Sequence, residues 1–313
     1  MRGLPATDPS RYQVILPPAA LSGPAGQVWE QLVLPRHARR RGTTLLVNPA
    51  NLAPVSFPGN VVVIHDAAAL RNPGWYSPAY ARWQRLLLPR VARGAKAIIT
   101  PSDFSRRELV ELLGVDPGKV SVVPGGVDER FGPQVDPEPA TAALGLERPY
   151  VLTVAGRTAR KNLSALERTA SELDRHGFDL VLAGARRREF AGDSAAGAAR
   201  ELGHVPDALL PGLYAGASAF VLPSLHEGFG LTALEAMKSG LPVVAAPGGA
   251  LPEVCGDAAT WVDPLDPGAI AEAVLTALDR DRPSPASLAQ AGRFSWERTV
   301  AGVDAVVGSL LPG

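Results

Sequence analysis

The amino-acid sequence predicts an α/β protein of two Rossmann-like domains. Short apolar runs, each of the length of one buried strand, recur along the chain, and helix-forming stretches follow most of them. The chain has 313 residues, of which 46% are hydrophobic, enough for the cores of two medium-sized domains. Residues 132–148, GPQVDPEPATAALGLER, are rich in proline, alanine and charge, which is typical of a linker. We therefore expect one domain over residues 1–140, a second over 148–294 and a final helix over 295–313.

The composition excludes several classes of protein. Lys+Arg and Asp+Glu both number 31, so no overall charge attracts nucleic acid or an anionic membrane. Cys255 is the single cysteine, which rules out an internal disulfide and a metal site made of cysteines, and fits a reducing compartment. No apolar run approaches the length of about 18 residues that spans a membrane, and the sequence MRGLPATDPSRYQ lacks the apolar core of a signal peptide. We expect a soluble cytoplasmic protein with no nucleic-acid partner.

Five short apolar segments in the first half of the chain are strand candidates. Glycine, proline or polar residues bound them, and they are residues 12–16, 45–47, 61–64, 97–100 and 120–123. Helices are expected over residues 28–41, which end in a basic cluster, and over residues 105–113, which Gly114 ends. Strands and helices therefore alternate, as they do along an α/β sheet.

Residues 77–93, SPAYARWQRLLLPRVAR, have the features of an amphipathic helix. A serine and a proline begin the segment as N-cap and first helical residue, and Trp83, Leu87 and Val91 fall on one stripe. We expect this stripe to pack on the domain core, with the arginines in solvent. The alternative is that the segment contacts a membrane or a lipid-linked acceptor, because aromatic residues and arginines together suit an interface.

The second half contains three clear strand candidates, residues 150–154, 179–183 and 219–222. After the third, the turn His226–Gly230 leads into a helix over residues 231–238. Backbone N–H groups of such a glycine-containing turn approach an anion closely, and the helix dipole adds positive charge, so the pattern predicts a phosphate site.

Two glutamates, Glu227 and Glu235, stand eight positions apart on either side of this helix start. Both are candidates to contact a ligand that lies across it. For Glu235 there is an alternative: Thr232-x-x-Glu235 has the form of a capping box, in which the carboxylate only satisfies backbone donors of its own helix.

Two further places carry chemically useful side chains at strand ends. Arg157 and Lys161 follow the strand 150–154 and form a cationic pair suited to a diphosphate, although a solvated basic turn would look the same. His65 follows the strand 61–64, at the end where α/β sheets bind ligands. A structural histidine fits that position equally well.

The central stretch resembles the signature of retaining glycosyltransferases of family 4. The matching residues are Glu227-Gly228-Phe229-Gly230, Glu235-Ala236-Met237 and Gly240-Leu241-Pro242-Val243-Val244. Residues 99–128 are also similar to that family, except that Gly125 stands where an asparagine is usual. The resemblance implies GT-B architecture, in which two Rossmann-like domains face each other across a cleft and the last helix crosses back onto the first domain.

The resemblance also implies roles for the candidate residues. Glu227 would lie beside the donor sugar, Lys161 and Arg157 beside the leaving diphosphate, and His65 on the acceptor side. The donor-binding residues would be Gly228, Phe229, Gly230, Leu231 and Glu235, with His204 and Val205 along the nucleobase. Such enzymes use no metal and no cofactor beyond the nucleotide-sugar donor.

The sequence departs from the family in two places. The family arginine usually stands five positions before the lysine, whereas Arg157 stands four before Lys161, and Arg160 is the alternative. The family also begins with a strand and a Gly-rich loop, while this sequence begins at what resembles the second strand. We expect the first domain to lack that strand and loop.

These observations favour a metal-independent retaining glycosyltransferase. It would move a hexose from a nucleotide-diphosphate sugar to a saccharide or lipid-linked acceptor, in the cytoplasm or at the inner face of the membrane. The alternative is a catalytically silent nucleotide-sugar-binding homologue or scaffold. A nicotinamide-dependent oxidoreductase is disfavoured, because no G-x-G-x-x-G follows the first strand of either half.

Overall fold

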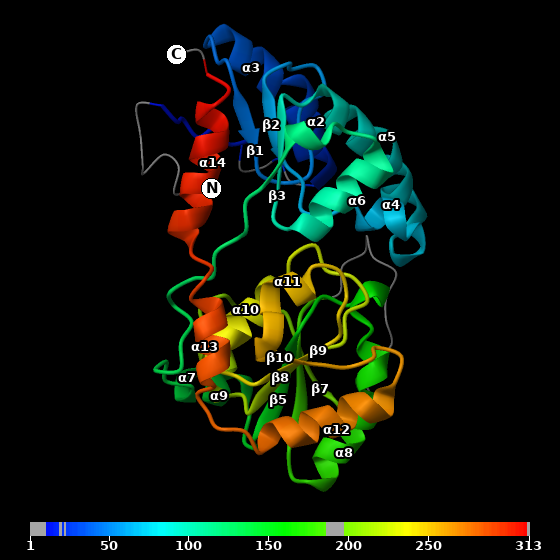
Figure 1. Cartoon of the computed structure of the whole chain (residues 1–313), viewed down its shortest axis with the longest axis vertical. Coiled ribbons are helices and arrows are strands. Elements are labelled where there is room, and N and C mark those ends of the chain that lie inside the picture. Colours follow the sequence, from blue (N-terminus) through cyan, green and yellow to red (C-terminus); the bar gives the residue numbers. More distant parts are fainter. Residues whose placement is uncertain (1–10, 19–20, 22, 186–196, 312–313) are drawn as a thin grey trace. The chain divides into compact units, whose positions relative to one another are not determined.

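Two parallel β-sheets organise the chain (Figure 1). The computed structural model describes residues 11–18, 21, 23–185 and 197–311. By its internal contacts the chain divides into two units. The first unit contains residues 1–71, 81–126 and 296–313, and the second contains residues 72–80 and 127–295. Each is described separately below.

The sheet of the first unit has four parallel strands in the described residues, in the order β1-β2-β3-β4. They are β1 (Leu46–Asn48), β2 (Asn60–Val63), β3 (Ala97–Thr100) and β4 (Val120–Val122). All four were predicted to within one residue at each end. The predicted strand over residues 12–16 is wrong: this segment is not a strand, and its apolar side chains Val14 and Leu16 are 59% and 75% exposed.

Helices cover both faces of this sheet. On one face, α5 (Pro78–Gly94) and α6 (Asp103–Leu113) pack on strand residues that include Val62 and Ile98. On the other, α14 (Trp296–Gly308) packs through Val303 and Val307. The remaining helices of the unit are α2 (Gly23–Leu32), α3 (Leu34–Arg40), α4 (Ala68–Arg71) and the 3-10 turn Pro117–Lys119.

The predicted packing stripe of the segment 77–93 is only partly right. The residues that α5 buries are Ala81, Gln84, Leu88, Val91 and Ala92. Val91 therefore belongs to the buried face, whereas Trp83 is 36% exposed. The buried stripe is thus rotated from the predicted one and includes small residues, Ala81 and Ala92, that the apolar pattern did not mark.

The sheet of the second unit has six parallel strands in the described residues, in the order β10-β9-β8-β5-β6-β7. They are β5 (Tyr150–Val154), β6 (Asp179–Ala183), β7 (Arg200–Gly203), β8 (Ala219–Leu222), β9 (Val243–Ala245) and β10 (Ala259–Trp261). Strands β5, β6 and β8 have the predicted bounds. The edge strand β7 was not predicted, because its sequence, RELG, has no apolar run.

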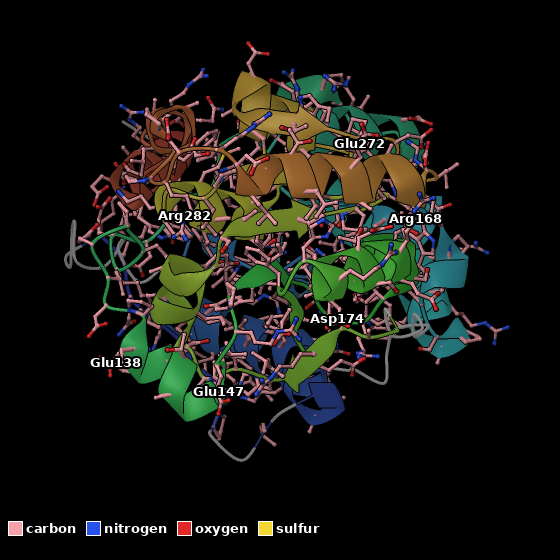
Figure 2. All side chains as sticks on the ribbon, turned by 90° about the horizontal axis from the view of Figure 1, so that it is seen from below. Glu138, Glu147, Arg168, Asp174, Glu272 and Arg282 are labelled. Atoms are coloured by element: carbon pink, nitrogen blue, oxygen red, sulfur yellow. The ribbon has the colours of Figure 1, made fainter. Side chains whose placement is uncertain are left out.

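Two layers of helices enclose this sheet. Helices α8 (Glu167–Arg175) and α12 (Pro267–Leu278) pack on one face and share a core with Val151 and Val221; Figure 2 shows Asp174 on α8 and Glu272 on α12. On the other face the ring of Tyr214, in α9 (Leu210–Gly216), packs against Phe220. The remaining elements are α7 (Glu138–Leu144), α10 (Leu231–Lys238), α11 (Leu251–Cys255), α13 (Pro285–Ala291) and the 3-10 turns Pro73–Trp75, Ala159–Lys161, Leu163–Leu166 and Gly256–Ala258.

The segment predicted as a linker, residues 132–148, contains helix α7, and the Cβ atom of Ala140 in α7 lies against Gly212 of α9. It belongs to the second unit. Among the residues that the structure describes, none of the helices combines the length and apolar character needed to cross a membrane.

Candidate functional site

The order of strands in the second sheet marks one place as special. From β5 the chain proceeds to β6 and β7 on one side, then returns to β8 on the other side of β5 and continues to β9 and β10. The loops that leave β5 and β8 therefore diverge. In open α/β sheets, ligands bind in the crevice at the carboxyl ends of two such strands.

Hydrogen bonds join these two loops. Leu225 N–H donates to the carbonyl of Arg160 (2.8 Å), and the side-chain amide of Asn162 donates to the carbonyls of Pro223 (3.2 Å) and Pro264 (2.8 Å). Asn162 has φ +53°, in the left-handed region that asparagine tolerates better than most residues. The loops are thus held together before any ligand binds.

The structure brings Glu227 together with two cations. Lys161 Nζ lies 2.5 Å from Glu227 Oε1, and Arg160 Nη1 lies 3.0 Å from Oε2. Arg160 also donates to the carbonyl of His226 (2.9 Å). Glu227 and Lys161 are buried. Arg160 and Lys161 come from the loop after β5 and Glu227 from the loop after β8, so the neighbouring strands create the cluster.

The electrostatics of the cluster keep Glu227 ionised. Burial acts to raise the pKa of Glu227, but the charges of Lys161 and Arg160 and the hydrogen bond from Lys161 outweigh it and lower the pKa to about 2. Two cations and one carboxylate leave a positive charge at this crevice. Such a site suits an anion that offers several oxygens, for example a diphosphate.

Two glycines that the sequence analysis assigned no role allow this arrangement. Gly248 and Gly249 follow β9, and a Cβ atom would lie 2.1 Å from the carbonyl oxygen of Ser224 at Gly248 and 2.2 Å from that of Glu227 at Gly249. Gly249 also has φ +70°. The backbone N–H of Ala250 then donates to the Glu227 carbonyl (2.8 Å). The double glycine after a strand was the signal for this close approach.

The helix start at α10 rules out the capping-box alternative for Glu235. The N-cap is Gly230, with φ +110° and no side chain to cap the helix, so Glu235 lies five residues after the N-cap instead of three. Its carboxylate instead accepts a hydrogen bond from the Tyr214 hydroxyl (2.9 Å). The first amides of α10 therefore lie at the carboxyl end of β8, where the sequence predicted a phosphate site.

The environment of Glu235 raises its pKa to about 7. Burial is the main cause, and the charges of Asp128 and Asp207 act in the same direction. The Tyr214 hydroxyl and the charge of Arg130 oppose them. Glu235 therefore changes its charge near neutral pH, unlike Glu227.

Arg157 does not join the cluster at Glu227. Its guanidinium is buried and forms an ion pair with Glu201 of β7. The cation next to Lys161 at Glu227 is Arg160, the alternative that the sequence left open. Arg157 instead ties the loop after β5 to the edge strand.

The other predicted donor-site residues lie at the carboxyl ends of the same sheet. His204 and Val205 follow β7; Val205 is buried and the His204 side chain is exposed. Gly228 is buried, Leu231 is 40% exposed, and the ring of Phe229 packs edge-on against Phe294 (centroids 5.8 Å apart). Within the described residues, no three His, Cys, Asp or Glu side chains gather as candidate ligands of one metal ion.

His65 belongs to the first unit and lies two residues after Val63, the last residue of β2. Its side chain is exposed, and its Nε2 lies 3.1 Å from the carbonyl oxygen of Pro49. Because a carbonyl only accepts hydrogen bonds, this contact requires a proton on Nε2, and of the two neutral tautomers it therefore fits the one protonated there. The Nδ1 atom is then the acceptor of the ring.

Both units match known families. Residues 14–131 match the model described as "Glycosyltransferase Family 4", and residues 148–280 match that described as "Glycosyl transferases group 1". Together these matches include His65, Lys161, Glu227 and Glu235.

Curated relatives agree with the family models. The chain is 34% identical over 257 residues to the O-antigen chain mannosyltransferase B of Escherichia coli, an alignment that covers 76% of this chain and 67% of that protein. It is 32% identical over 237 residues to the D-inositol 3-phosphate glycosyltransferase of Acidothermus cellulolyticus, with 68% and 53% covered. The chain thus spans between half and two thirds of the length of these relatives.

A solved structure shows the same fold. The protein HepE of Anabaena, crystallised with UDP and glucose, has a TM-score of 0.66 to this structure at 20% sequence identity. The superposition covers 80% of this chain and 72% of HepE.

Proposed function

The chain belongs to glycosyltransferase family 4, and from this premise we propose that it transfers a hexose from a nucleotide-diphosphate sugar to a saccharide or lipid-linked acceptor. The transfer retains the configuration at the anomeric carbon and uses no metal ion. The chain covers only part of its relatives, so donor, acceptor and activity are all part of this proposal.

The observation that carries the proposal is the cluster of Arg160 and Lys161 on Glu227 at the crevice between β5 and β8. Negative charge develops on the diphosphate as the bond to the anomeric carbon breaks. Cations and amides that are already in place stabilise that charge without reorganising. In this proposal Lys161, Arg160 and the amides at the start of α10 bind the diphosphate.

The two glutamates have different tasks. Glu227, ionised and held by two cations, orients the donor sugar and stabilises positive charge on its ring. Glu235 accepts hydrogen bonds from the ribose hydroxyls, while His204 and Val205 lie along the nucleobase. His65, in the first unit, contacts the acceptor.

One surface supports an acceptor that is linked to lipid. The outward side of α5 exposes Trp83 and Leu86. Four exposed arginines lie on the same helix: Arg82, Arg85, Arg90 and Arg93. An exposed tryptophan among arginines suits the headgroup region of an anionic membrane. We therefore place the enzyme at the cytoplasmic face of a membrane while it works.

Nucleotide binding tests the donor site directly. Thermal unfolding and calorimetry of the full chain with UDP, GDP, ADP and NAD will show which nucleotide binds. At a concentration of about a hundred times Kd, the true ligand stabilises the protein by about 2.7 kcal/mol. We expect one nucleoside diphosphate to raise the midpoint and NAD to leave it unchanged.

Matched variants locate the binding. Lys161→Ala and Glu235→Ala are expected to abolish the rise, whereas Lys96→Ala and Glu272→Ala, which change exposed residues elsewhere, keep it. If no nucleotide binds the folded wild-type chain, the donor site is wrong. If a nucleotide binds but neither UDP-glucose nor GDP-mannose is consumed with any acceptor, the proposal of an enzyme is wrong. The chain is then a catalytically silent homologue that binds the nucleotide sugar.

A further inference from the structure

The turn that carries His65 is held by side chains from three neighbouring segments. The N–H of His65 donates to Asn51 Oδ1 (2.8 Å), and its carbonyl accepts from the Ser105 hydroxyl (2.8 Å). The carbonyl of Ile64 accepts from Thr100 Oγ1 (2.8 Å). The N–H of Ile64 also donates to the carbonyl of Ile99 in β3 (2.8 Å). Side chains therefore add to this strand contact in fixing the backbone on both sides of His65.

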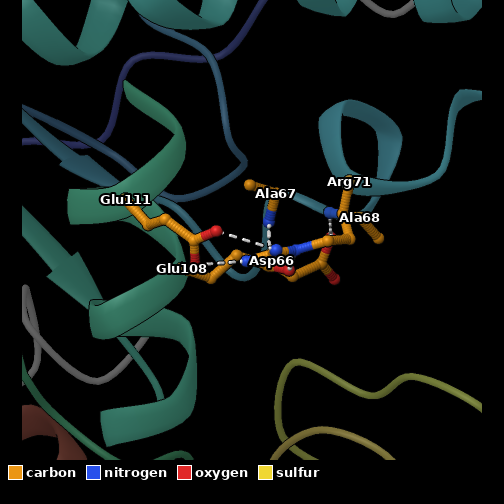
Figure 3. A network of polar contacts seen from close by, with 6 residues as sticks. All are labelled: Asp66, Ala67, Ala68, Arg71, Glu108 and Glu111. Carbon is orange, nitrogen blue, oxygen red and sulfur yellow. Dashed lines mark hydrogen bonds and ion pairs between the residues drawn. The ribbon is translucent and has the colours of Figure 1, made fainter. Parts of the chain in front are cut away.

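Helix α6 supplies a second contact one turn further on. Glu108 Oε2 accepts a hydrogen bond from the N–H of Ala67 (3.0 Å), as Figure 3 shows. Ser105 and Glu108 are three residues apart, so they lie on the same side of the helix. Their exposed fractions are 0% and 2%. One buried face of α6 thus contacts the turn both at His65 and two residues after it.

Placing a carboxylate at the buried position of Glu108 costs free energy of folding. A carboxylate so deeply buried loses its hydration, and an apolar side chain of similar size would pack there at a lower cost in free energy. Arg71 compensates part of the charge: its Nε lies 3.3 Å from Glu108 Oε1, and its Nη atoms bind Glu111 at 2.9 and 2.6 Å (Figure 3). Arg71 is the last residue of α4, the short helix that the turn leads into. The carboxylate therefore fixes both ends of the segment 67–71.

We propose that Ser105 and Glu108 are positioning residues for His65. They set the backbone of residues 64–68 so that the imidazole keeps its contact with Pro49 and presents Nδ1 as the hydrogen-bond acceptor. The catalytic part of this inference rests on the proposed function, in which His65 contacts a substrate. Neither residue touches a substrate itself.

The state of the His65 ring tests the proposal without any activity. In ¹⁵N-labelled full chain, the ring signals of His65 are assigned by their loss in His65→Gln, and they report which nitrogen carries the proton. We expect Ser105→Ala and Glu108→Ala to shift these signals and mix the two tautomers. Glu108→Gln keeps a carbonyl oxygen for Ala67 and should restore most of the wild-type signal.

Glu111→Gln is the matched control, because Glu111 binds Arg71 but no backbone atom of the turn is bonded to it in Figure 3. It should leave the His65 signals unchanged. Wild-type His65 signals in folded Ser105→Ala and Glu108→Ala would overturn the proposal. If Glu108→Ala does not fold, the His65 signals of Ser105→Ala and Glu108→Gln decide whether the proposal holds.

A double-mutant cycle on turnover separates positioning from general damage. With UDP-glucose or GDP-mannose as donor, Ser105→Ala should lower kcat by about tenfold to a hundredfold, the scale of a small misplacement, with little change in KM for the donor. In the His65→Gln background the same change should have no further effect, whereas effects that multiply contradict a role through His65. If the wild-type chain consumes neither donor, the proposed function has failed, and the NMR experiment alone decides the positioning role.

Discussion

Glu227 and Glu235 belong to the same helix–loop segment, yet their surroundings move their pKa values in opposite directions. Both are removed from water, which raises a carboxyl pKa. Two cations in direct contact reverse that effect at Glu227, while Glu235 has a tyrosine hydroxyl and a more distant arginine. One carboxylate is permanently charged, and the other changes charge at neutral pH.

The first prediction concerns nucleotide affinity and pH. In the proposed function, the ionised form of Glu235 accepts hydrogen bonds from the ribose hydroxyls. Because the pKa of Glu235 is about 7, nucleotide affinity should then fall about tenfold for each pH unit below 7. Glu235→Gln should bind more weakly at pH 8 and lose this part of the pH dependence. Calorimetric titrations from pH 5.5 to 8.5 measure both slopes. Parallel slopes for wild type and variant contradict the role of Glu235.

The same pKa predicts a stability effect of Glu235 in the ligand-free protein. The folded-state pKa of about 7 lies above the ordinary 4.5, so the contribution of Glu235 to stability is fully present below pH 4.5 and is lost as pH rises through 7. Glu235→Gln should therefore be more stable than wild type at pH 8, by on the order of 2 kcal/mol, and about equal at pH 4.5. Urea unfolding at the two pH values measures this, and an equal gain at both would show another cause.

A third prediction follows from the buried pair of Lys161 and Glu227. Removing only one partner leaves a buried charge poorly compensated, so Lys161→Ala should cost about 3 kcal/mol of the free energy of unfolding. Replacing both, as Lys161→Met with Glu227→Gln, should recover most of that loss while nucleotide binding stays absent. Urea unfolding and calorimetry on the same samples separate the two effects. A double variant as unstable as the single one contradicts this account.

At the scale of elements, the loop 247–250 after β9 has to pass very close to the loop that carries Glu227. A fourth prediction compares two glycines with positive φ. Gly249→Ala should cost more than about 3 kcal/mol and weaken nucleotide binding, because its Cβ meets the Glu227 backbone at 2.2 Å. At Gly177, with φ +82° and open space around it, alanine should cost only about 1 kcal/mol. Equal losses in urea unfolding would mean that the close approach does not matter.

The exposed side of α5 gives a fifth prediction at this scale. Trp83→Ser with Arg90→Glu, seven positions further along the same side of the helix, removes an aromatic side chain and reverses one charge on the face that the fold leaves in solvent. Sedimentation with vesicles that contain phosphatidylglycerol should show binding of wild type and a severalfold loss in the variant. Vesicles of phosphatidylcholine alone are the control. Equal sedimentation of both proteins with both vesicles contradicts the membrane proposal.

Elements with a simple pattern could be predicted, and elements that depend on distant neighbours could not. The strands 150–154, 179–183 and 219–222 are mostly apolar runs, and the structure confirms their bounds. Strand β7 is polar because it lies at the edge of the sheet, so no apolar run announces it. Residues 12–16 are apolar enough for a strand, but the structure leaves them outside both sheets.

The candidate site shows the same division. The motif pointed to Glu227, Glu235 and Lys161, but the choice of Arg160 over Arg157 as neighbour of Glu227 depends on which strands are adjacent. The partner of Glu235, Tyr214, lies 21 residues away on another helix. The predicted helix 231–238 has the observed bounds, and its N-cap, Gly230, lies five residues before Glu235, too far for the capping box that the spacing of Thr232 and Glu235 suggested.

At the scale of the whole molecule, the chain leaves the first unit for the second time after residue 126 and returns to it at residue 296. Helix α14 then covers one face of the first sheet, where Val303 and Val307 are buried with Val61 and Ile99. Tyr12, near the start of the described chain, donates a hydrogen bond from its hydroxyl to Asp304 of α14 (2.6 Å). The core of the first unit is therefore built from both ends of the described chain.

This arrangement has a consequence for biosynthesis. A ribosome delivers residues 127–295 before it delivers α14, so the second unit has all of its strands while one face of the first sheet is still bare. The first unit is thus begun first and completed last. Until α14 packs, the side chains of Val61 and Ile99 form an apolar surface that a chaperone can bind.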